Sequence, residues 1–206
     1  MIEEICDSEW PNVAKLIAYA IPNALMSKLG SNFGSIFYKK IIEQEYSCGY
    51  VAKDEFGNIL GVIIGTTNYP KSRSVALKKQ LVKLLIAANF RIFRLSVINW
   101  MIKGFLEKIT NREKDSANRP AAELVAIAVC NKEQGTGLAQ ELVKEMEKFM
   151  VSKKIIEPYT ILTEKHNLRA NKFYAKIGAV LVKTFIHHGR EINEWHKEIA
   201  VVQKND

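Results

Sequence analysis

The sequence predicts a mixed α/β fold in which strands and helices alternate along one domain, residues 1–206. Two apolar segments, residues 59–66 and 124–129, have the aliphatic and β-branched composition of strands buried inside a sheet. A helix with one apolar face follows the second segment across a glycine turn. The length of 206 residues and the hydrophobic fraction of 48% are those of a single globular domain.

The elements before and after this central part can be assigned from apolar periodicity, caps and turn residues. Ser8 can cap the first helix and Pro22 ends it, and the loop 54–58 is typical of a hairpin. Glu157-Pro158 breaks the chain ahead of the last strands. The expected strands are residues 2–6, 49–53, 59–66, 124–129, 159–163, 179–186 and 192–202. The expected helices start near residues 8, 31, 137 and 168.

Residues 71–110 are predicted to form a basic helical insertion between the third and fourth strands. Leucines recur at helical spacing and lysines lie on the opposite side. Residues 71–108 contain nine basic residues and one acid, which accounts for the whole net charge of +8. The insertion is expected to pack on its own domain, on a second subunit of a homodimer, or on a membrane surface, or to favour an anionic substrate. No nucleic acid is expected as a partner, because no binding motif accompanies the charge.

The turn after the central strand carries the strongest local signal for a binding site. Gly135, Thr136 and Gly137 open a helix, and a helix start attracts anions through its unpaired N–H groups and its dipole. Glycine also lets a phosphate approach the backbone closely. The chain has no GxxxxGK[ST] string, so a P-loop is excluded. Taken alone, the two glycines are also compatible with an ordinary turn.

Two motifs decide between these interpretations. Gln134, Gly137 and Ala139 form the pattern Q-x-x-G-x-A, and a second segment follows the pattern N-x-x-A-x-x-F-Y-x-x-x-G. The residues of the second segment are Asn167, Ala170, Phe173, Tyr174 and Gly178. Together the motifs resemble those of the GNAT superfamily of acyl-CoA-dependent N-acyltransferases, in the family's order and separation. The resemblance is clear over residues 121–185, with Ala179 where the family usually has Phe.

The resemblance implies a GNAT-like fold, which is a mixed, mostly antiparallel central sheet with helices on both faces. It also implies acetyl-CoA as cosubstrate, with its pyrophosphate on the glycine turn. Backbone groups of the preceding strand are expected to pair with the pantetheine, and an N–H of Ile127 or Val129 to face the oxyanion. The residues expected to contact the cosubstrate are Ile127, Ala128, Val129, Gln134, Gly135, Thr136, Gly137, Leu138, Ala139, Asn167, Phe173 and Tyr174.

Tyr174 is the expected general acid, because the matching tyrosine of the family points at the cofactor sulfur. A phenol with a reference pKa near 10 is protonated at neutral pH and can donate. The alternative is a core tyrosine on an amphipathic helix. Asn167 is expected to hydrogen-bond the cofactor, to cap the following helix, or both.

The expected general base is Glu123, which begins the central strand where family members often direct a carboxylate toward the amine. An exposed charge at a strand end is the alternative. Glu164, at the end of the neighbouring strand, is the second choice. His166 titrates near neutrality, but it is interpreted as a surface residue.

Several other kinds of protein and site are not expected. Cys6, Cys48 and Cys130 are scattered and form no CxxC pair, so neither a disulfide framework nor a zinc site is predicted. The histidines at positions 187, 188 and 196 have no ligand spacing with a carboxylate or cysteine, so no metal is expected. The sequence shows no signal peptide and no apolar stretch near the roughly 20 residues of a membrane span. A cytoplasmic location is therefore expected.

The sequence therefore predicts an acetyl-CoA-dependent N-acetyltransferase. The expected acceptor is a primary amine of a small molecule, for example an amino sugar on an anionic carrier. Two alternatives stay open: acetylation of a protein N-terminus or lysine, and a non-catalytic acyl-CoA-binding or membrane-peripheral module. The identity of the acceptor and the oligomeric state, monomer or homodimer, are not specified by the sequence.

Overall fold

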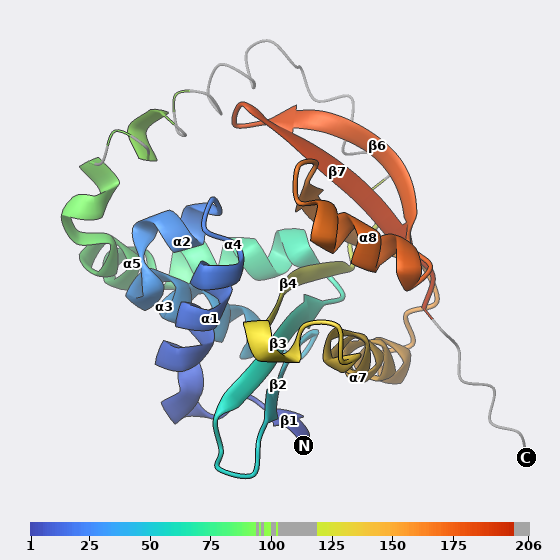
Figure 1. Ribbon diagram of the computed structural model, residues 1–206. Coiled ribbons are helices and arrows are strands. Elements are labelled where there is room, and N and C mark those ends of the chain that lie inside the picture. Colours follow the sequence, from blue (N-terminus) through green and yellow to red (C-terminus); the bar gives the residue numbers. More distant parts are fainter. Residues whose placement is uncertain (94, 96, 100–101, 103–118, 200–206) are drawn as a thin grey trace, which may run out of the picture.

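The computed structural model describes residues 1–93, 95, 97–99, 102 and 119–199, and a seven-stranded sheet forms its centre (Figure 1). The strand order is β1-β2-β3-β4-β5-β7-β6, and every neighbouring pair is antiparallel except β4 and β5. The strands are β1 (Ile2–Glu4), β2 (Ser47–Lys53), β3 (Ile59–Thr66), β4 (Glu123–Val129), β5 (Tyr159–Glu164), β6 (Val180–His187) and β7 (Arg190–Lys197). The mixed, mostly antiparallel sheet expected from the sequence is confirmed.

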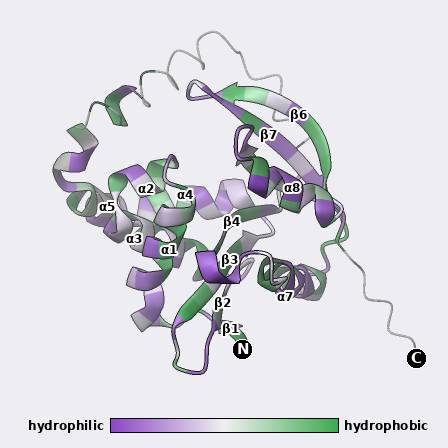
Figure 2. Ribbon diagram, in the orientation of Figure 1, coloured by the Kyte–Doolittle hydropathy of each residue, from purple (hydrophilic) through white to green (hydrophobic). Residues whose placement is uncertain are grey.

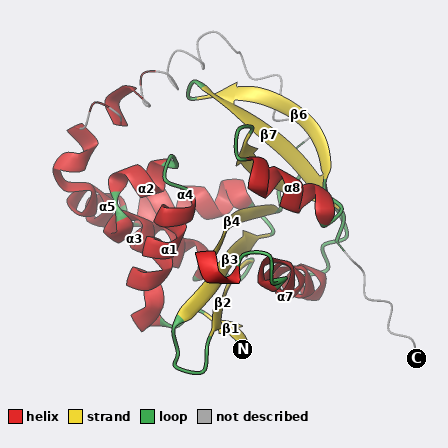
Figure 3. Ribbon diagram, in the orientation of Figure 1, coloured by secondary structure: helices red, strands yellow, loops and turns green. Residues whose placement is uncertain are grey.

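Helices pack on both faces of the sheet (Figure 3). On one face, α1 and α3 bury Val13, Ile17 and Phe37 against Val62 and Ile64 of β3. On the other face, α7 and α8 pack on a second apolar cluster. Figure 2 shows the hydrophobic residues of the central strands between these two layers. The helices are α1 (Trp10–Ala20), α2 (Leu25–Leu29), α3 (Ser31–Ile42), α4 (Tyr69–Lys79), α5 (Leu81–Ala88), α7 (Leu138–Ser152) and α8 (Leu168–Lys176).

The structure corrects the predicted ends of several elements. The five-residue helix α2 was not predicted, because it is short and begins soon after Pro22. The predicted four-residue connection between the last two strands is a two-residue turn in which His188 and Gly189 both have positive φ, 52° and 72°. Two left-handed residues give the type I′ turn that matches strand twist, so β7 begins already at Arg190.

The described part of the basic insertion packs on its own domain. Ser72 of α4 joins Ser47 and Thr66 in a buried cluster of hydroxyls with O···O distances of 2.8–3.1 Å. Farther along, Phe93 and Leu95 are 71% and 84% exposed. The end of the insertion and residues 110–118 of the predicted loop lie outside the described residues. Residues 200–202 of the predicted last strand also lie outside them. No described helix has the length and apolarity needed to cross a bilayer.

The parallel neighbours β4 and β5 part soon after they begin. They pair only at Glu123 with Thr160 and at Leu124 with Ile161, although each strand has six or seven residues. Both strands then lead into a turn and a helix, α7 after β4 and α8 after β5. The two helix starts therefore lie beyond the separated ends of these strands.

A buried polar contact fixes α7 against the sheet. Glu147 of α7 accepts a hydrogen bond from the hydroxyl of Tyr159 at 2.8 Å and pairs with Lys197 of β7 at 2.6 Å. Glu147 and Lys197 are only 5% and 8% exposed. Burying a charge without its partner is costly, so this arrangement holds α7, and with it the glycine turn, in one position.

Candidate active site

The glycine turn before α7 has open space in front of it, and its backbone has a conformation that only glycine tolerates. Gly135 and Gly137 have φ values of 87° and 98°. A Cβ built on either residue would meet no other atom within 4 Å, so the space in front of the backbone is free. The conformation and the open space both favour glycine here, and the space leaves room for a ligand.

Main-chain N–H groups at this turn are available to an anion. Thr136 Oγ1 donates to the Glu133 carbonyl at 2.8 Å and lies 3.4 Å from the N–H of Leu138. Within the described residues, the N–H groups of Gly135, Gly137 and Ala139 have no hydrogen-bond acceptor. Free amides at the positive end of a 15-residue helix form an anion site of the kind that phosphates occupy.

Side chains around the turn link it to α8 and α1. Gln134 donates to Asn131 at 2.8 Å and accepts from the guanidinium of Arg169 in α8. Asn131 in turn donates to the hydroxyl of Tyr19 at 2.8 Å. Arg169 was not predicted, because it occupies an unspecified position of the second motif and reaches the turn only through the fold. Its cation beside the free amides makes it a further residue suited to a phosphate.

The groove on the other side of the turn is less suited to a diphosphate than the side of Arg169. It has a volume of about 540 Å³ and reaches from Thr136 and Leu138 to Ile2 of β1. Three carboxylates, those of Glu133, Glu141 and Glu145, line it and outnumber its two cations, the N-terminus and Lys53, of which Lys53 is already paired with Glu3 and Glu9. Like charges repel, so a diphosphate is favoured on the side of Arg169 and the separated strands.

Alternate backbone groups of β4 face the space left by β5. Cys130 donates its N–H to Leu60 at 2.8 Å, and Ala128 is the register partner of Val62. In an antiparallel ladder the hydrogen-bonded residues recur at every second position, so the N–H and C=O of Ala128 point to β3. Those of Ile127 and Val129 point to the opposite side, where β5 has moved away. The backbone of Ala128 therefore faces β3, whereas the backbone of Ile127 and Val129 faces the space beside β5. The sequence did not predict this difference.

Tyr174 reaches this region from α8. It is 6% exposed, and its ring lies 5.5 Å from that of Phe173 and 6.5 Å from that of Trp195, centroid to centroid. Burial raises the pKa of the Tyr174 hydroxyl, so the group stays protonated and able to donate. Phe173 is half-buried and packs on the same apolar cluster.

Asn167 caps α8, which is one of the two roles predicted for it. Its side-chain oxygen accepts from the N–H of Ala170 at 3.2 Å. The side-chain NH₂ has no acceptor among the described residues. Leu138 and Ala139, the first residues of α7, are half-buried beside the turn.

Glu123 lies at the point where β4 and β5 part. Its neighbours Ala122 and Leu124 belong to the cluster under α7 and α8, so the side chain of Glu123 points to the other face. Glu123 is 7% exposed rather than an exposed strand end. Burial raises the pKa of its carboxyl to about 8, although Arg119 and Arg73 lower it. A carboxylate with such a pKa is a competent base near neutral pH.

The carboxyl oxygens of Glu123 and the hydroxyl of Tyr174 are nearly, but not completely, buried. Neither the carboxyl of Glu123 nor the hydroxyl of Tyr174 has a hydrogen-bond partner among the described residues. Within that part of the chain, Arg190 Nε is the only fully buried side-chain N or O atom that lacks a partner. The oxygens of Glu123 and Tyr174 therefore keep a small exposed area, and the two residues lie on opposite faces of the sheet.

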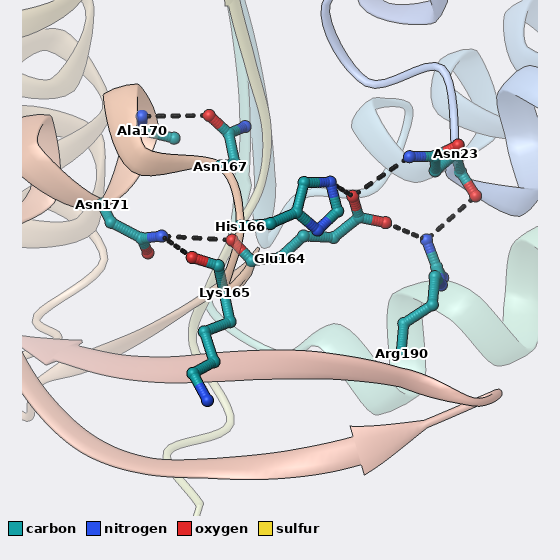
Figure 4. A network of polar contacts seen from close by, with 8 residues as sticks. All are labelled: Asn23, Glu164, Lys165, His166, Asn167, Ala170, Asn171 and Arg190. Carbon is teal, nitrogen blue, oxygen red and sulfur yellow. Dashed lines mark hydrogen bonds and ion pairs between the residues drawn. The ribbon is translucent and has the colours of Figure 1, made fainter.

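The second predicted base, Glu164, is held in a polar network (Figure 4). Its carboxylate forms an ion pair with Arg190, accepts from Asn23 at 3.2 Å and lies 3.0 Å from His166 Nε2. Arg190 also donates to the Asn23 carbonyl at 3.0 Å. A carboxylate with three partners is a weaker candidate for proton transfer than Glu123. His166 is exposed, as expected.

No group of three or more His, Cys, Asp or Glu side chains in the described residues could hold a metal ion. The three cysteines are free. Phe33 and Phe37 of α3 are core residues.

Comparison with known proteins supports the resemblance that the two motifs indicate. Residues 104–179 match the family model described as the acetyltransferase (GNAT) family. The solved structure of SsHAT is 14% identical with a TM-score of 0.63, covering 95% of this chain and 97% of that chain. A GCN5-related N-acetyltransferase from Kribbella flavida is 14% identical with a TM-score of 0.60, covering 96% of each chain. No curated protein sequence matches the chain.

A third solved structure is Naa20 from Chaetomium thermophilum, in complex with a bisubstrate analogue. It is 13% identical with a TM-score of 0.58, covering 97% of this chain and 86% of that chain. At such identities the likeness shows a shared fold, and the family model adds the sequence evidence over its 76 residues. Together they agree with the resemblance that the two motifs carry: residues 104–179 match the model of the GNAT acetyltransferases, and the chain shares the fold of these solved structures.

Proposed function

We propose that this protein transfers an acetyl group from acetyl-CoA to the primary amine of a small molecule. The observation that supports this most is the set of free N–H groups at Gly135, Gly137 and Ala139, directly beyond the separated strands β4 and β5. The turn suits a diphosphate, and the backbone of Ile127 and Val129 suits the amide groups of a pantetheine arm.

Each step of acetyl transfer has a suitable group in the chain. Bound acetyl-CoA supplies an activated acetyl thioester. Glu123 takes the proton that the attacking amine loses, and Tyr174, on the opposite face, gives a proton to the departing sulfur. An N–H of Ile127 or Val129 donates to the carbonyl oxygen as it gains charge.

The network around Glu164 favours a small acceptor over a polypeptide. Asn23 belongs to the segment between α1 and α2, whereas Arg190 begins β7 after the β6–β7 turn. The contacts of Asn23 with Glu164 and Arg190 therefore join two distant segments on the face that Glu123 uses (Figure 4). A peptide that lay across this face would have to break these contacts.

Release of free thiol from acetyl-CoA in the presence of an amine tests the proposal. A panel should contain amino sugars, linear primary amines, and peptides with a free N-terminus or an internal lysine. We expect amine-dependent thiol release with small amines, and a mass increase of one acetyl group on the product. Thiol release with peptides alone would establish the protein-acetylating alternative. CoA binding without turnover of any amine would establish a non-catalytic module.

Replacing Tyr174 by Phe should lower kcat about 10- to 100-fold, because the departing sulfur loses its proton donor. The affinity for CoA, measured by calorimetry, should stay within about twofold, since the ring and its packing are kept. Tyr50→Phe is the matched control: Tyr50 is half-buried in the same apolar cluster but lies on β2, away from the separated strands. Unchanged kcat in Tyr174→Phe would reject Tyr174 as the acid.

A further inference from the structure

Several large apolar side chains of the basic insertion point into solvent. Ile86, Phe93, Leu95 and Ile102 are 72%, 71%, 84% and 52% exposed, and we call these four the exposed apolar residues. Single apolar side chains are common on protein surfaces, whereas several that follow one another along a short segment mark a surface for contact. A partner that removes them from water would gain free energy.

The segment that carries these residues is attached to the domain by its other side. Ala88 and Val97 are each 1% exposed and belong to the apolar cluster of α1 and α3. Ile86 and Ala88 are two positions apart in α5, which is roughly 200° around the helix, so they lie on opposite sides. Arg91 Nη1 lies 3.5 Å from the carbonyl oxygen of Leu29, at the end of α2. The core therefore holds the segment in place without covering the exposed apolar residues.

Positive charge accompanies the exposed apolar residues. Residues 71–108 contain nine basic residues and one acid. Lys83 is exposed and precedes Ile86 by three positions in α5, so the two side chains share one face of the helix. Lys78 of α4 is exposed as well. Neither lysine has an acidic partner among the described residues, so this surface attracts anions.

The surface is separate from the proposed acetyl-CoA site. Figure 1 shows α5 and the segment after it at the outer edge of the helical layer, away from α7 and α8. The free amides of the glycine turn and the separated ends of β4 and β5 lie beside α7 and α8. A partner could therefore cover the exposed apolar residues while the acetyl-CoA site stays open.

We infer that this surface of the insertion binds an anionic phospholipid membrane. Headgroup phosphates attract the lysines, and the exposed apolar residues enter the boundary between headgroups and acyl chains. A second copy of the chain is a poorer fit, because two surfaces with this charge repel each other. Nucleic acid would attract the lysines but would leave the apolar side chains in water. The inference does not depend on the proposed acetyl transfer.

Co-sedimentation with lipid vesicles tests the inference. Vesicles of phosphatidylcholine alone are compared with vesicles that also contain about 30 mol% phosphatidylglycerol. We expect the wild-type protein to bind the anionic vesicles at least 10-fold more tightly at about 100 mM NaCl. The difference should shrink at about 500 mM NaCl, because salt screens the attraction.

Phe93→Ser should weaken binding to the anionic vesicles about 10-fold, because a large apolar side chain no longer enters the membrane. Phe56→Ser is the matched control and should bind like the wild type: Phe56 is 80% exposed, but it lies in the hairpin loop between β2 and β3. Lys83→Gln should weaken binding about fivefold through the loss of one charge. Lys144→Gln, at an exposed lysine of α7, should not.

The midpoint of thermal unfolding should be the same in the wild type and all four variants, since each changed side chain is exposed. Equal binding of the wild type to neutral and anionic vesicles would overturn the inference, as would unchanged binding in Phe93→Ser. Light scattering that shows a dimer, which Phe93→Ser converts to a monomer, without vesicle binding would also overturn it and identify a second copy as the partner. None of these results bears on the acetyltransferase proposal, which thiol release tests.

Discussion

Replacing Glu123 by Gln is expected to lower kcat by about 100- to 1,000-fold, the usual contribution of a positioned general base. The substitution keeps the size of the side chain but removes its ability to accept a proton. The ratio of wild-type to variant kcat/KM should rise as the pH passes about 8, the pKa of Glu123. Using one acceptor for both proteins cancels the titration of the amine itself.

The same substitution should stabilise the protein at alkaline pH. The pKa of Glu123 is about 8 in the folded protein against an ordinary value of 4.5, so the folded state binds an extra proton between these pH values. The free energy of unfolding of the wild type therefore decreases as the pH rises from about 4.5 through 8, whereas Gln cannot ionise. The difference should reach about 5 kcal/mol above pH 8.

Thermal or urea unfolding at pH 6 and pH 9 measures this difference in the free energy of unfolding. Glu157→Gln, in an exposed loop, is the control and should alter neither activity nor stability. A gain in stability together with a loss of activity is typical of a residue kept for chemistry rather than for the fold. Full activity in Glu123→Gln would exclude Glu123 as the base. The role would then pass to Glu164 or to water.

Gly137→Ala is expected to weaken CoA binding about 100-fold. The φ of 98° is unfavourable for any residue with a Cβ, and the new methyl group would occupy the open space before the free amides. Gly57→Ala provides the matched control. Gly57 has a similar φ of 81° and equally open surroundings, but it lies in the hairpin loop between β2 and β3.

Both alanine variants should lose similar amounts of stability, on the order of 1 kcal/mol, because the backbone strain is alike. Only Gly137→Ala should lose affinity for CoA, measured by calorimetry. Equal CoA affinity in the two variants would mean that the turn before α7 does not contact the diphosphate.

Local patterns were sufficient to predict much of the fold. β3 and α8 have the bounds that their apolar periodicity predicted, Ile59–Thr66 and Leu168–Lys176. The glycine turn was also recognisable, because the chemistry that gives a helix start its affinity for anions lies within a few consecutive residues. A short helix such as α2 has too few residues to show a period, so it was missed.

Contacts between distant residues could not be predicted from the sequence. Arg169 meets Gln134 across 35 residues, Arg119 meets Glu194 across 75, and Asn23 meets Glu164 across 141. No local pattern encodes these pairs, since they depend on how β5 and the β6–β7 hairpin are placed. The burial of Glu123 is a similar case: its position in the chain suggested a strand end, and only packing raises its pKa.

Calorimetric titration of the wild-type protein with CoA, 4′-phosphopantetheine and pantetheine tests the central claim most directly. If main-chain amides of the turn bind phosphate, CoA should bind most tightly of the three. 4′-Phosphopantetheine should bind at least 10-fold more tightly than pantetheine, because hydrogen bonds to charged groups contribute about 1.5–3 kcal/mol each. Absence of heat with CoA, or equal affinity for the two pantetheines, would contradict the claim.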